Sequence, residues 1–319
     1  MASSPLGLIV PARCTPPLPD VPTLHVPMPE LGGIACAQQG WWGGEVLQAT
    51  RVPGDDELVL HYARSEDFLW AVAELSHERD LLRQSQALYG QLLRTVRAQG
   101  YPHLLRVWNY LPRINAVEYG EERYQTFNRG RRRAFAAAGL SVGAGAPAAC
   151  ALGTAQGTLR VGLLAGRRPV QAIENPRQVS AYAYPRQYGE EPPLFSRAAW
   201  LSQPGGRDLL LVSGTASIVG HATVHAGDVL AQTRESVRNI GAVLQVANAR
   251  AGHPCWRLAD LSGCVYVRHA RDYPVVRRCL EDFGLHRFCY LQAEVCRSDL
   301  LVEIEAEAGP VGFAPRNCM

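Results

Sequence analysis

The chain has 319 residues, of which 47% are hydrophobic and 19% charged, a composition typical of a globular protein with a sizeable core. Its net charge is only +3 and its longest basic run covers residues 131–133, so a surface for the phosphate backbone of nucleic acids is not expected. All 32 basic residues are arginines, which excludes Schiff-base and Walker-A lysines and supplies planar groups suited to carboxylates.

The cysteine pattern and the apolar segments bound the class of protein further. None of the nine cysteines forms a CxxC pair, so neither a disulfide framework nor a metal site is expected. The first residues lack the basic and long apolar regions of a signal peptide, and no apolar stretch reaches the roughly 18 residues of a membrane span. The sequence therefore predicts a cytoplasmic protein without a cofactor, a nucleic-acid partner or a membrane partner.

The first half of the chain contains two expected helices with a strand between them. Residues 1–60 are rich in Pro and Gly and predict loops and short strands. Leucines at helical spacing predict a helix over 65–100, followed by a strand over 103–115. A second helix is expected over 118–138, and the Gly- and Ala-rich segment 141–150 reads as a linker.

The second half repeats this order. Its expected elements are strand 158–166, loop tract 174–198, strand and turn 208–221, helix 228–250, strand 263–269, helix 272–283, and strands 288–296 and 300–308. Because helices and strands alternate twice in the same order, the sequence predicts an α+β fold of two related halves, residues 1–148 and 149–319.

The last expected strand, LLVEIEAEAG, alternates strictly between acidic and apolar residues. Glu303, Glu305 and Glu307 share one face, and aliphatic side chains take the other. Carboxylates two residues apart on a strand lie about 7 Å from one another, so either water covers this face or other groups surround it. A solvated surface residue is the simplest interpretation of Glu303 alone, and we expect Glu305 and Glu307 where this face runs toward solvent.

The tract ENPRQVSAYAYPRQYG and the residues after it combine arginines and tyrosines in a loop. Arg186 and Arg197 are candidate cations for a ligand carboxylate, and Tyr182, Tyr184 and Tyr188 can donate further hydrogen bonds. Solvated loop charges are the alternative interpretation of both arginines.

The segment SGTASIVGH places small residues after the apolar run DLLLV. Gly214, Thr215 and Ala216 predict a strand end at which backbone N–H groups can approach a ligand. An alternative is a hydrolase in which Ser213 or Ser217 is activated by His221. The GxSxG motif of such hydrolases is missing from the sequence.

Two resemblances extend these inferences. The C-terminal part, with Asn239, the VYV run and the closing LVEIEAEA strand, resembles the RidA/YjgF fold. Five motifs in order, YPHLLRVWNYLPRIN, ERYQTFNRGRRRAF, ENPRQVSAYAYPRQYG, SGTASIVGH and EVCRSDLLVEIEAEA, resemble the chorismatases over about residues 100–308. This resemblance implies RidA-like mixed sheets packed with helices, arranged as a pseudo-trimer within one chain. It also implies a monomer, with a dimer as the alternative.

The chorismatase resemblance implies a reaction and two catalytic residues. The substrate would be chorismate, and the products pyruvate and 3-hydroxybenzoate, with 4-hydroxybenzoate in one branch, for pigment or quinone biosynthesis. The general acid maps onto Glu303. Cys296, seven positions earlier, maps onto the residue that separates aromatising members from hydrolases, which have alanine there and form a dihydroxycyclohexadiene carboxylate. The alternatives are such a hydrolase and a non-catalytic RidA-like protein that binds aromatic acids.

The implied chemistry sets a condition on Glu303. The methylene carbon of the enolpyruvyl group must be protonated before pyruvate can leave, and this needs a positioned acid. A glutamate has an ordinary pKa of about 4.3, so its pKa must rise toward 7 for it to carry a proton at neutral pH. Burial and nearby carboxylates would raise the pKa, whereas an exposed strand face would not.

Overall fold

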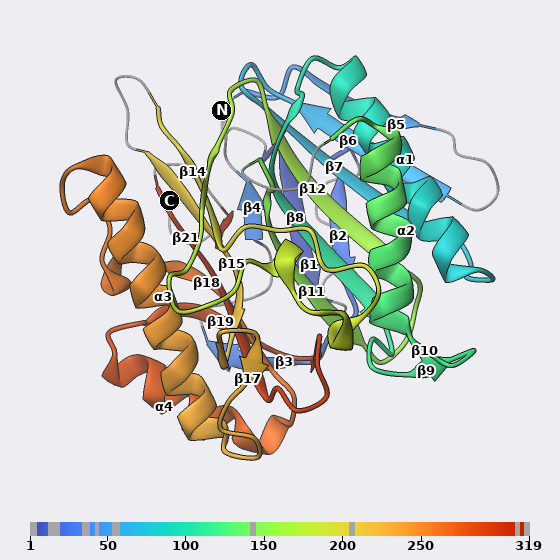
Figure 1. Ribbon diagram of the computed structural model, residues 1–319. Helices are drawn as coiled ribbons and strands as arrows, with labels where there is room; N and C mark the ends of the chain where they lie inside the picture. Colours follow the sequence, from blue (N-terminus) through green and yellow to red (C-terminus); the bar gives the residue numbers. More distant parts are fainter. Residues whose placement is uncertain are drawn as a thin grey trace.

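Two large mixed sheets stack face to face, and each carries a pair of helices on its outer side (Figure 1). The computed structural model describes residues 5–11, 20–33, 39–41, 45–52, 58–140, 145–203, 208–309 and 313–315. The predicted α+β fold with mixed sheets packed against helices is confirmed. Cys14, Cys36 and Cys318 lie outside these ranges, and Cys150, Cys255, Cys279 and Cys296 within them are free thiols.

The first large sheet has seven strands. In spatial order these are β20 (Glu294–Val295), β11 (Ala148–Thr154), β8 (His103–Pro112), β12 (Arg160–Gly166), β7 (Phe68–Leu75), β6 (Leu58–Arg64) and β5 (Gln48–Val52). β11 runs parallel to β8, and the other pairings are antiparallel. β11 spans the expected division between residues 148 and 149, so this sheet takes strands from both sides of it. The division stays a prediction.

The second large sheet also has seven strands. In spatial order these are β13 (Gln171–Ile173), β14 (Ala198–Leu201), β15 (Leu209–Ala216), β21 (Val302–Ala308), β18 (Ser262–Val267), β19 (Arg287–Gln292) and β3 (Glu30–Gly33). β18 and β19 are parallel, and β21 lies between β15 and β18 with antiparallel pairing to both. β21 is therefore a central strand, with neighbours along both edges.

Within the described residues, four α-helices cover the outer faces of the two sheets. α1 (Leu81–Ala98) and α2 (Arg123–Ala137) pack on the first sheet, and α3 (Val229–Ala251) and α4 (Tyr273–Asp282) on the second (Figure 1). Among the described residues, none of the helices is long and apolar enough to cross a membrane.

Smaller elements complete the fold. A four-stranded sheet contains β2 (Thr23–Val26), β1 (Gly7–Pro11), β4 (Gln39–Trp41) and β22 (Phe313–Pro315). Two short hairpins are β9 (Val117–Glu118) with β10 (Glu121–Glu122), and β16 (Ile218–Val219) with β17 (Ala222–Thr223). The tract expected as a loop contains two 3₁₀ turns, η1 (Ala181–Ala183) and η2 (Arg186–Tyr188).

The expected helix over 65–100 is wrong in its first part. Residues from Phe68 to Leu75 form β7, and the helix begins only at Leu81, where the Asp80 side chain accepts a hydrogen bond from the Arg83 backbone N–H. β7 is buried on both faces along almost its whole length, so its apolar run lacks the alternation that identifies a strand. The second helix likewise begins at Arg123 rather than 118, because β9 and β10 come first.

The expected strand over 288–296 is also corrected. It divides into β19, in the second sheet, and β20, which pairs with β11 at the edge of the first sheet. The chain therefore crosses from one sheet to the other just before Cys296. The Arg268 guanidinium fixes the segment that follows by donating hydrogen bonds to the carbonyls of Val295, Arg297 and Leu300 at 3.1, 2.8 and 2.7 Å.

The two faces of β21 were predicted correctly, but their surroundings were not. Ile304 and the other aliphatic residues pack against α3, and the three glutamates face the first sheet. Glu305 and Glu307, expected near solvent, are only 4% and 7% exposed. Arg106 of β8 forms an ion pair with Glu305 at 2.9 Å, so the first sheet, rather than water, covers this face.

Candidate active site

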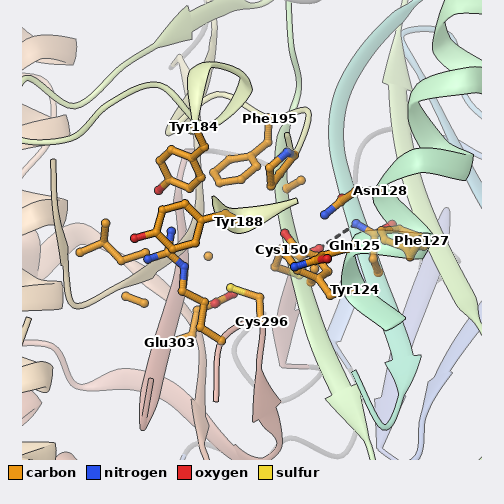
Figure 2. A pocket seen from close by; sticks show the side chains of 18 of the residues that line it. Tyr124, Gln125, Phe127, Asn128, Cys150, Tyr184, Tyr188, Phe195, Cys296 and Glu303 are labelled. Carbon is orange, nitrogen blue, oxygen red and sulfur yellow. Dashed lines mark hydrogen bonds between the residues drawn. The ribbon is translucent and has the colours of Figure 1, made fainter. Parts of the chain in front are cut away.

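One pocket lies where α2 and β11 face the ends of β15 and β21 (Figure 2). It is lined by seven of the residues predicted for the site: Glu303, Cys296, Arg197, Tyr184, Tyr188, Gly214 and Ala216. Three other predicted residues lie outside it. Arg186 lines a neighbouring cavity, Tyr182 packs against the core under α1 and α2, and the hydroxyl of Thr215 donates a hydrogen bond to the Ser213 carbonyl.

Glu303 is held at the inner end of this pocket by its neighbours in the sheet. It is 3% exposed and lies opposite Ala216 on β15 and Tyr266 on β18. The register of β15 shifts between Val212 and Thr215. A Cβ at Gly214, within this irregular stretch, would overlap Oε1 of Glu303. Glycine is therefore required at position 214 for the Glu303 carboxyl to occupy its place.

Glu303 is protonated at neutral pH. Its pKa is raised to about 8, chiefly by burial and also by the nearby Glu305 carboxylate, whereas the Arg197 guanidinium acts in the opposite direction. The pKa therefore lies above neutrality, as a general acid requires. Glu303 is therefore a buried residue of the pocket and not the solvated surface residue of the simplest interpretation.

Cys296 lines the same pocket as a neutral thiol. Burial raises its pKa to about 12, and the negative charge that Glu303 can carry adds to the effect. A thiol of this kind is a poor nucleophile, because the thiolate is the reactive form. Its side chain packs against apolar residues, so it acts in the pocket as a small hydrophobic group.

Three arginines give the pocket a positive lining. Arg131 on α2, Arg197 before β14 and Arg297 after Cys296 all line it. Each keeps at least one buried N–H group without a hydrogen-bond partner among the described residues, at Nε and Nη2 of Arg131, Nε of Arg197 and Nη2 of Arg297. Buried donors of this kind need an acceptor, and carboxylates satisfy guanidinium groups in pairs of hydrogen bonds. The lining therefore suits an anion with more than one carboxylate.

Aromatic rings orient two of these arginines. The Arg297 guanidinium carbon lies 3.8 Å from the ring centre of Tyr188 and 5.2 Å from that of Tyr184. Arg197 donates to the Tyr184 hydroxyl at 2.8 Å and to the Val179 carbonyl at 2.9 Å. Figure 2 shows Tyr184 and Tyr188 beside one another on one wall, across from the residues of α2.

Arg131 and Arg297 were missed by the sequence analysis, although α2 carries a signal for the first. Tyr124, Phe127, Asn128 and Arg131 all line the pocket, and they recur at spacings of three and four residues, which places them on one helix face. A helix face that carries Asn and Arg among aromatic residues differs from an apolar core stripe. Arg297 had no comparable signal, since its position depends on the crossing of the chain before Cys296.

Comparisons with known proteins show which family this chain is similar to. A family model described as "Chorismatase FkbO/Hyg5-like, N-terminal" matches residues 45–165. The chain is 40% identical over 252 residues to a chorismatase from Streptomyces rapamycinicus, covering 76% of this chain and 75% of that relative. The chain belongs to the chorismatase family. The predicted family is thus confirmed, and with it the prediction of an enzyme.

Two further relatives of this chorismatase family member are informative. A 3-hydroxybenzoate synthase from Streptomyces hygroscopicus is 37% identical over 258 residues, covering 77% of this chain and 75% of that relative. A crystal structure of a chorismatase matches with a TM-score of 0.83 at 30% identity, covering 96% of this chain and 93% of that one. The fold expected from the chorismatase resemblance is therefore confirmed.

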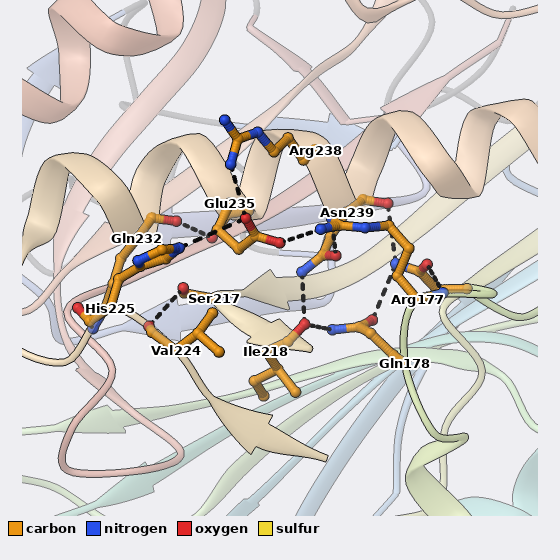
Figure 3. Close-up of polar contacts among 12 residues, drawn as sticks. Arg177, Gln178, Ser217, Ile218, Val224, His225, Gln232, Glu235, Arg238 and Asn239 are labelled. Atoms are coloured by element: carbon orange, nitrogen blue, oxygen red, sulfur yellow. Dashed lines mark hydrogen bonds and ion pairs between the residues drawn. The ribbon is translucent and has the colours of Figure 1, made fainter. Parts of the chain in front are cut away.

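A polar network on α3 fixes one wall of the pocket in this chorismatase family member (Figure 3). The Asn239 amide donates to the carbonyls of Ala216 and Ile218 at 3.1 and 2.9 Å, and its oxygen accepts from Arg177 at 2.7 Å. Glu235 in turn pairs with Arg177 and with Arg238. The backbone that carries Ala216 is thereby tied to the helix behind it.

The serine hydrolase alternative finds no support in the contacts. The Ser213 hydroxyl donates to the Ser196 carbonyl and accepts from the Ala149 N–H, and the Ser217 hydroxyl donates to the Val224 carbonyl. Nδ1 of His221 lies 3.3 Å from the Tyr188 hydroxyl. Both serines thus use their protons in backbone hydrogen bonds instead of pairing with a base.

We expect Glu303→Gln to stabilise the protein increasingly as pH rises. The native state keeps the Glu303 proton up to a pKa of about 8, whereas the unfolded chain loses it near 4.5, so wild-type stability falls across this window. The glutamine variant lacks this loss. Its advantage in the free energy of unfolding, from urea denaturation, should grow between these two pH values by on the order of 5 kcal/mol and stay level outside them.

The control is Glu281→Gln, which removes a carboxylate from a partly exposed position on α4. Its difference from wild type should lack the rise seen with Glu303→Gln. An advantage of Glu303→Gln that did not change with pH would contradict a buried, protonated Glu303.

Proposed function

We propose that this chain converts chorismate to pyruvate and 3-hydroxybenzoate, with 4-hydroxybenzoate as a further product. The observation that carries the proposal is a buried glutamate, Glu303, in a pocket lined by three arginines. Chorismate has two carboxylates, which the arginines can bind. It also has an enol ether that must gain a proton on its methylene carbon, which Glu303 can supply. The names of the relatives, chorismatase and 3-hydroxybenzoate synthase, support this choice. The proposal includes a monomer that acts in the cytoplasm.

The arginines would hold the two carboxylates of the substrate. The buried N–H groups of Arg131 lie on the α2 wall, and those of Arg197 and Arg297 belong to the wall with the tyrosines. A dianion between these walls would satisfy the unpaired donors and align the substrate ring across the pocket. Binding from two sides also restricts the enolpyruvyl group to few orientations, which lowers the entropy cost of reaching the transition state.

Glu303 would then transfer its proton to the methylene carbon of the enolpyruvyl group. The bond between the ring carbon and the ether oxygen breaks, and its electron pair leaves with pyruvate. The neighbouring ring hydroxyl attacks that carbon, loses its proton and forms an arene-oxide-like intermediate, which rearranges to the hydroxybenzoate. The atoms balance without water, and the released hydroxyl proton can restore the Glu303 carboxyl.

Cys296 would favour this route through its shape. A neutral thiol beside Glu303 fills space that water needs in order to attack the ring. Alanine at this position leaves room for a water molecule, in agreement with the hydrolases that carry alanine there.

The proposed function predicts that wild-type protein releases pyruvate from chorismate and that Glu303→Gln does so about 100- to 10,000-fold more slowly, the usual contribution of a general acid. A coupled lactate dehydrogenase assay measures both rates, and circular dichroism checks that the variant is folded. Chorismate binding without pyruvate release would favour the non-catalytic binding protein. Equal rates in the two proteins would remove Glu303 as the acid.

Gly214→Ala should also lower the rate of pyruvate release, by about 100-fold. The new Cβ would displace the Glu303 carboxyl, since it would overlap Oε1. Gly241→Ala is the matched control, because a Cβ at this position of α3 meets no atom within 4 Å. Similar rates in both variants would show that the position of the Glu303 carboxyl is not critical.

Cys296→Ala should change the product rather than stop the reaction. With space for water, part of the chorismate should appear as the dihydroxycyclohexadiene carboxylate instead of 3-hydroxybenzoate. Chromatography of the products measures this ratio, and Cys279→Ala, a buried cysteine of α4, is the control. An unchanged 3-hydroxybenzoate fraction would mean that Cys296 does not decide between water and the ring hydroxyl.

A further inference from the structure

A buried polar cluster lies between the two sheets, next to the pocket but not in its lining. Arg106 of β8 is 2% exposed, and its Nη2 lies 2.9 Å from Oε2 of Glu305. The Tyr266 hydroxyl donates to Oε1 of Glu305 at 2.9 Å, and the Tyr110 hydroxyl lies 3.0 Å from that of Tyr266. The proposed reaction does not itself use these groups.

We propose that Glu305 is a positioning residue for the proton of Glu303: its carboxylate, fixed by Arg106 and Tyr266, keeps the neighbouring Glu303 carboxyl protonated for transfer. This inference rests on the proposed role of Glu303 as the general acid. Glu305 acts on the proton of Glu303 and does not touch the substrate.

The geometry distinguishes the two carboxyls. Glu303 and Glu305 share one face of β21, two residues and about 7 Å apart, and both side chains are buried. Glu305 forms an ion pair with the Arg106 guanidinium and accepts a hydrogen bond from the Tyr266 phenol, and both contacts stabilise the charged form. Arg197, the cation that opposes protonation of Glu303, donates instead to the Val179 carbonyl and the Tyr184 hydroxyl. The negative charge of Glu305 therefore favours the neutral, protonated form of Glu303.

Other groups around the two carboxyls come from every element packed against them. Those near Glu303 are Tyr124 of α2, Cys150 of β11, Arg197 and Cys296, and those near Glu305 and Arg106 are Tyr110, Cys150, Tyr266 and Glu307. Burial raises the pKa of each of these tyrosines and cysteines above its ordinary value, so they stay neutral. The pKa of Glu303 is raised by the Glu305 charge and lowered by the Arg197 charge. Arg131 and Arg297 are further cations of the same pocket.

Removal of the Glu305 charge should move the pH dependence of the reaction. In Glu305→Gln, Glu303 loses a negative neighbour and should give up its proton at lower pH. A general acid must be protonated to act. The midpoint of the decrease in kcat at high pH should therefore shift to lower pH by about one unit or more. Arg106→Gln with Glu305→Gln removes the whole ion pair. It should move the fall in the same direction while leaving no unpaired buried guanidinium.

Glu307→Gln is the matched control, since Glu307 lies on the same face of β21 but about twice as far from Glu303. Its kcat should fall at the same pH as in wild type. A structural role of the ion pair would lower kcat equally at all pH values and leave the midpoint in place in every variant. That result would overturn the inference.

A second readout does not depend on activity. The infrared carbonyl band of a protonated carboxylic acid, identified by its loss in Glu303→Gln, can be titrated in wild type and in both Glu305 variants. Its midpoint should fall by the same amount as the kinetic midpoint. If wild type released no pyruvate, the proposed function would fail while this titration still tested the coupling. If pyruvate were released but the band midpoint stayed unchanged, only the role of Glu305 would be wrong.

Discussion

The burial of an acidic strand face between two sheets is the constraint on which this site depends. A buried carboxylate is costly unless a cation and hydrogen bonds compensate it. Glu305 has both, from Arg106 and Tyr266, whereas Glu303 faces a pocket and keeps its proton. Two identical side chains on one strand thus take opposite charge states because of what covers them. The difference gives the pocket an acid without any unusual residue.

The pocket forms only when distant parts of the chain come together. α2 contributes Arg131, the tract before β14 contributes Arg197, and the segment after β20 contributes Cys296 and Arg297. The crossing from β19 to β20 matters most, because it carries the chain from one sheet to the other beside Glu303. The cations and the acid therefore take their positions from the stacking of the sheets and not from a local motif.

The sequence was sufficient for some of these features and not for others. Alternation in β21 showed which residues share a face, but it could not show that β8 covers that face, so Glu305 and Glu307 were misplaced. β7 was taken for helix because strands buried on both faces lose their alternation. Arg186 and Arg197 occur in similar sequence contexts, yet Arg186 belongs to η2 and lines a neighbouring cavity, whereas Arg197 lines the pocket. The choice of Glu303 among three glutamates came from the family resemblance.

The most direct test of this account is a crystal structure of the Glu303→Gln variant with bound chorismate. Because this variant should react slowly, the substrate should remain intact in the crystal. We expect the two carboxylates within hydrogen-bond distance of guanidinium groups of Arg131, Arg197 or Arg297. The methylene carbon of the enolpyruvyl group should face the side chain at position 303. A substrate bound with that methylene directed away from position 303, or outside the arginine-lined pocket, would contradict the central claim that Glu303 delivers the proton.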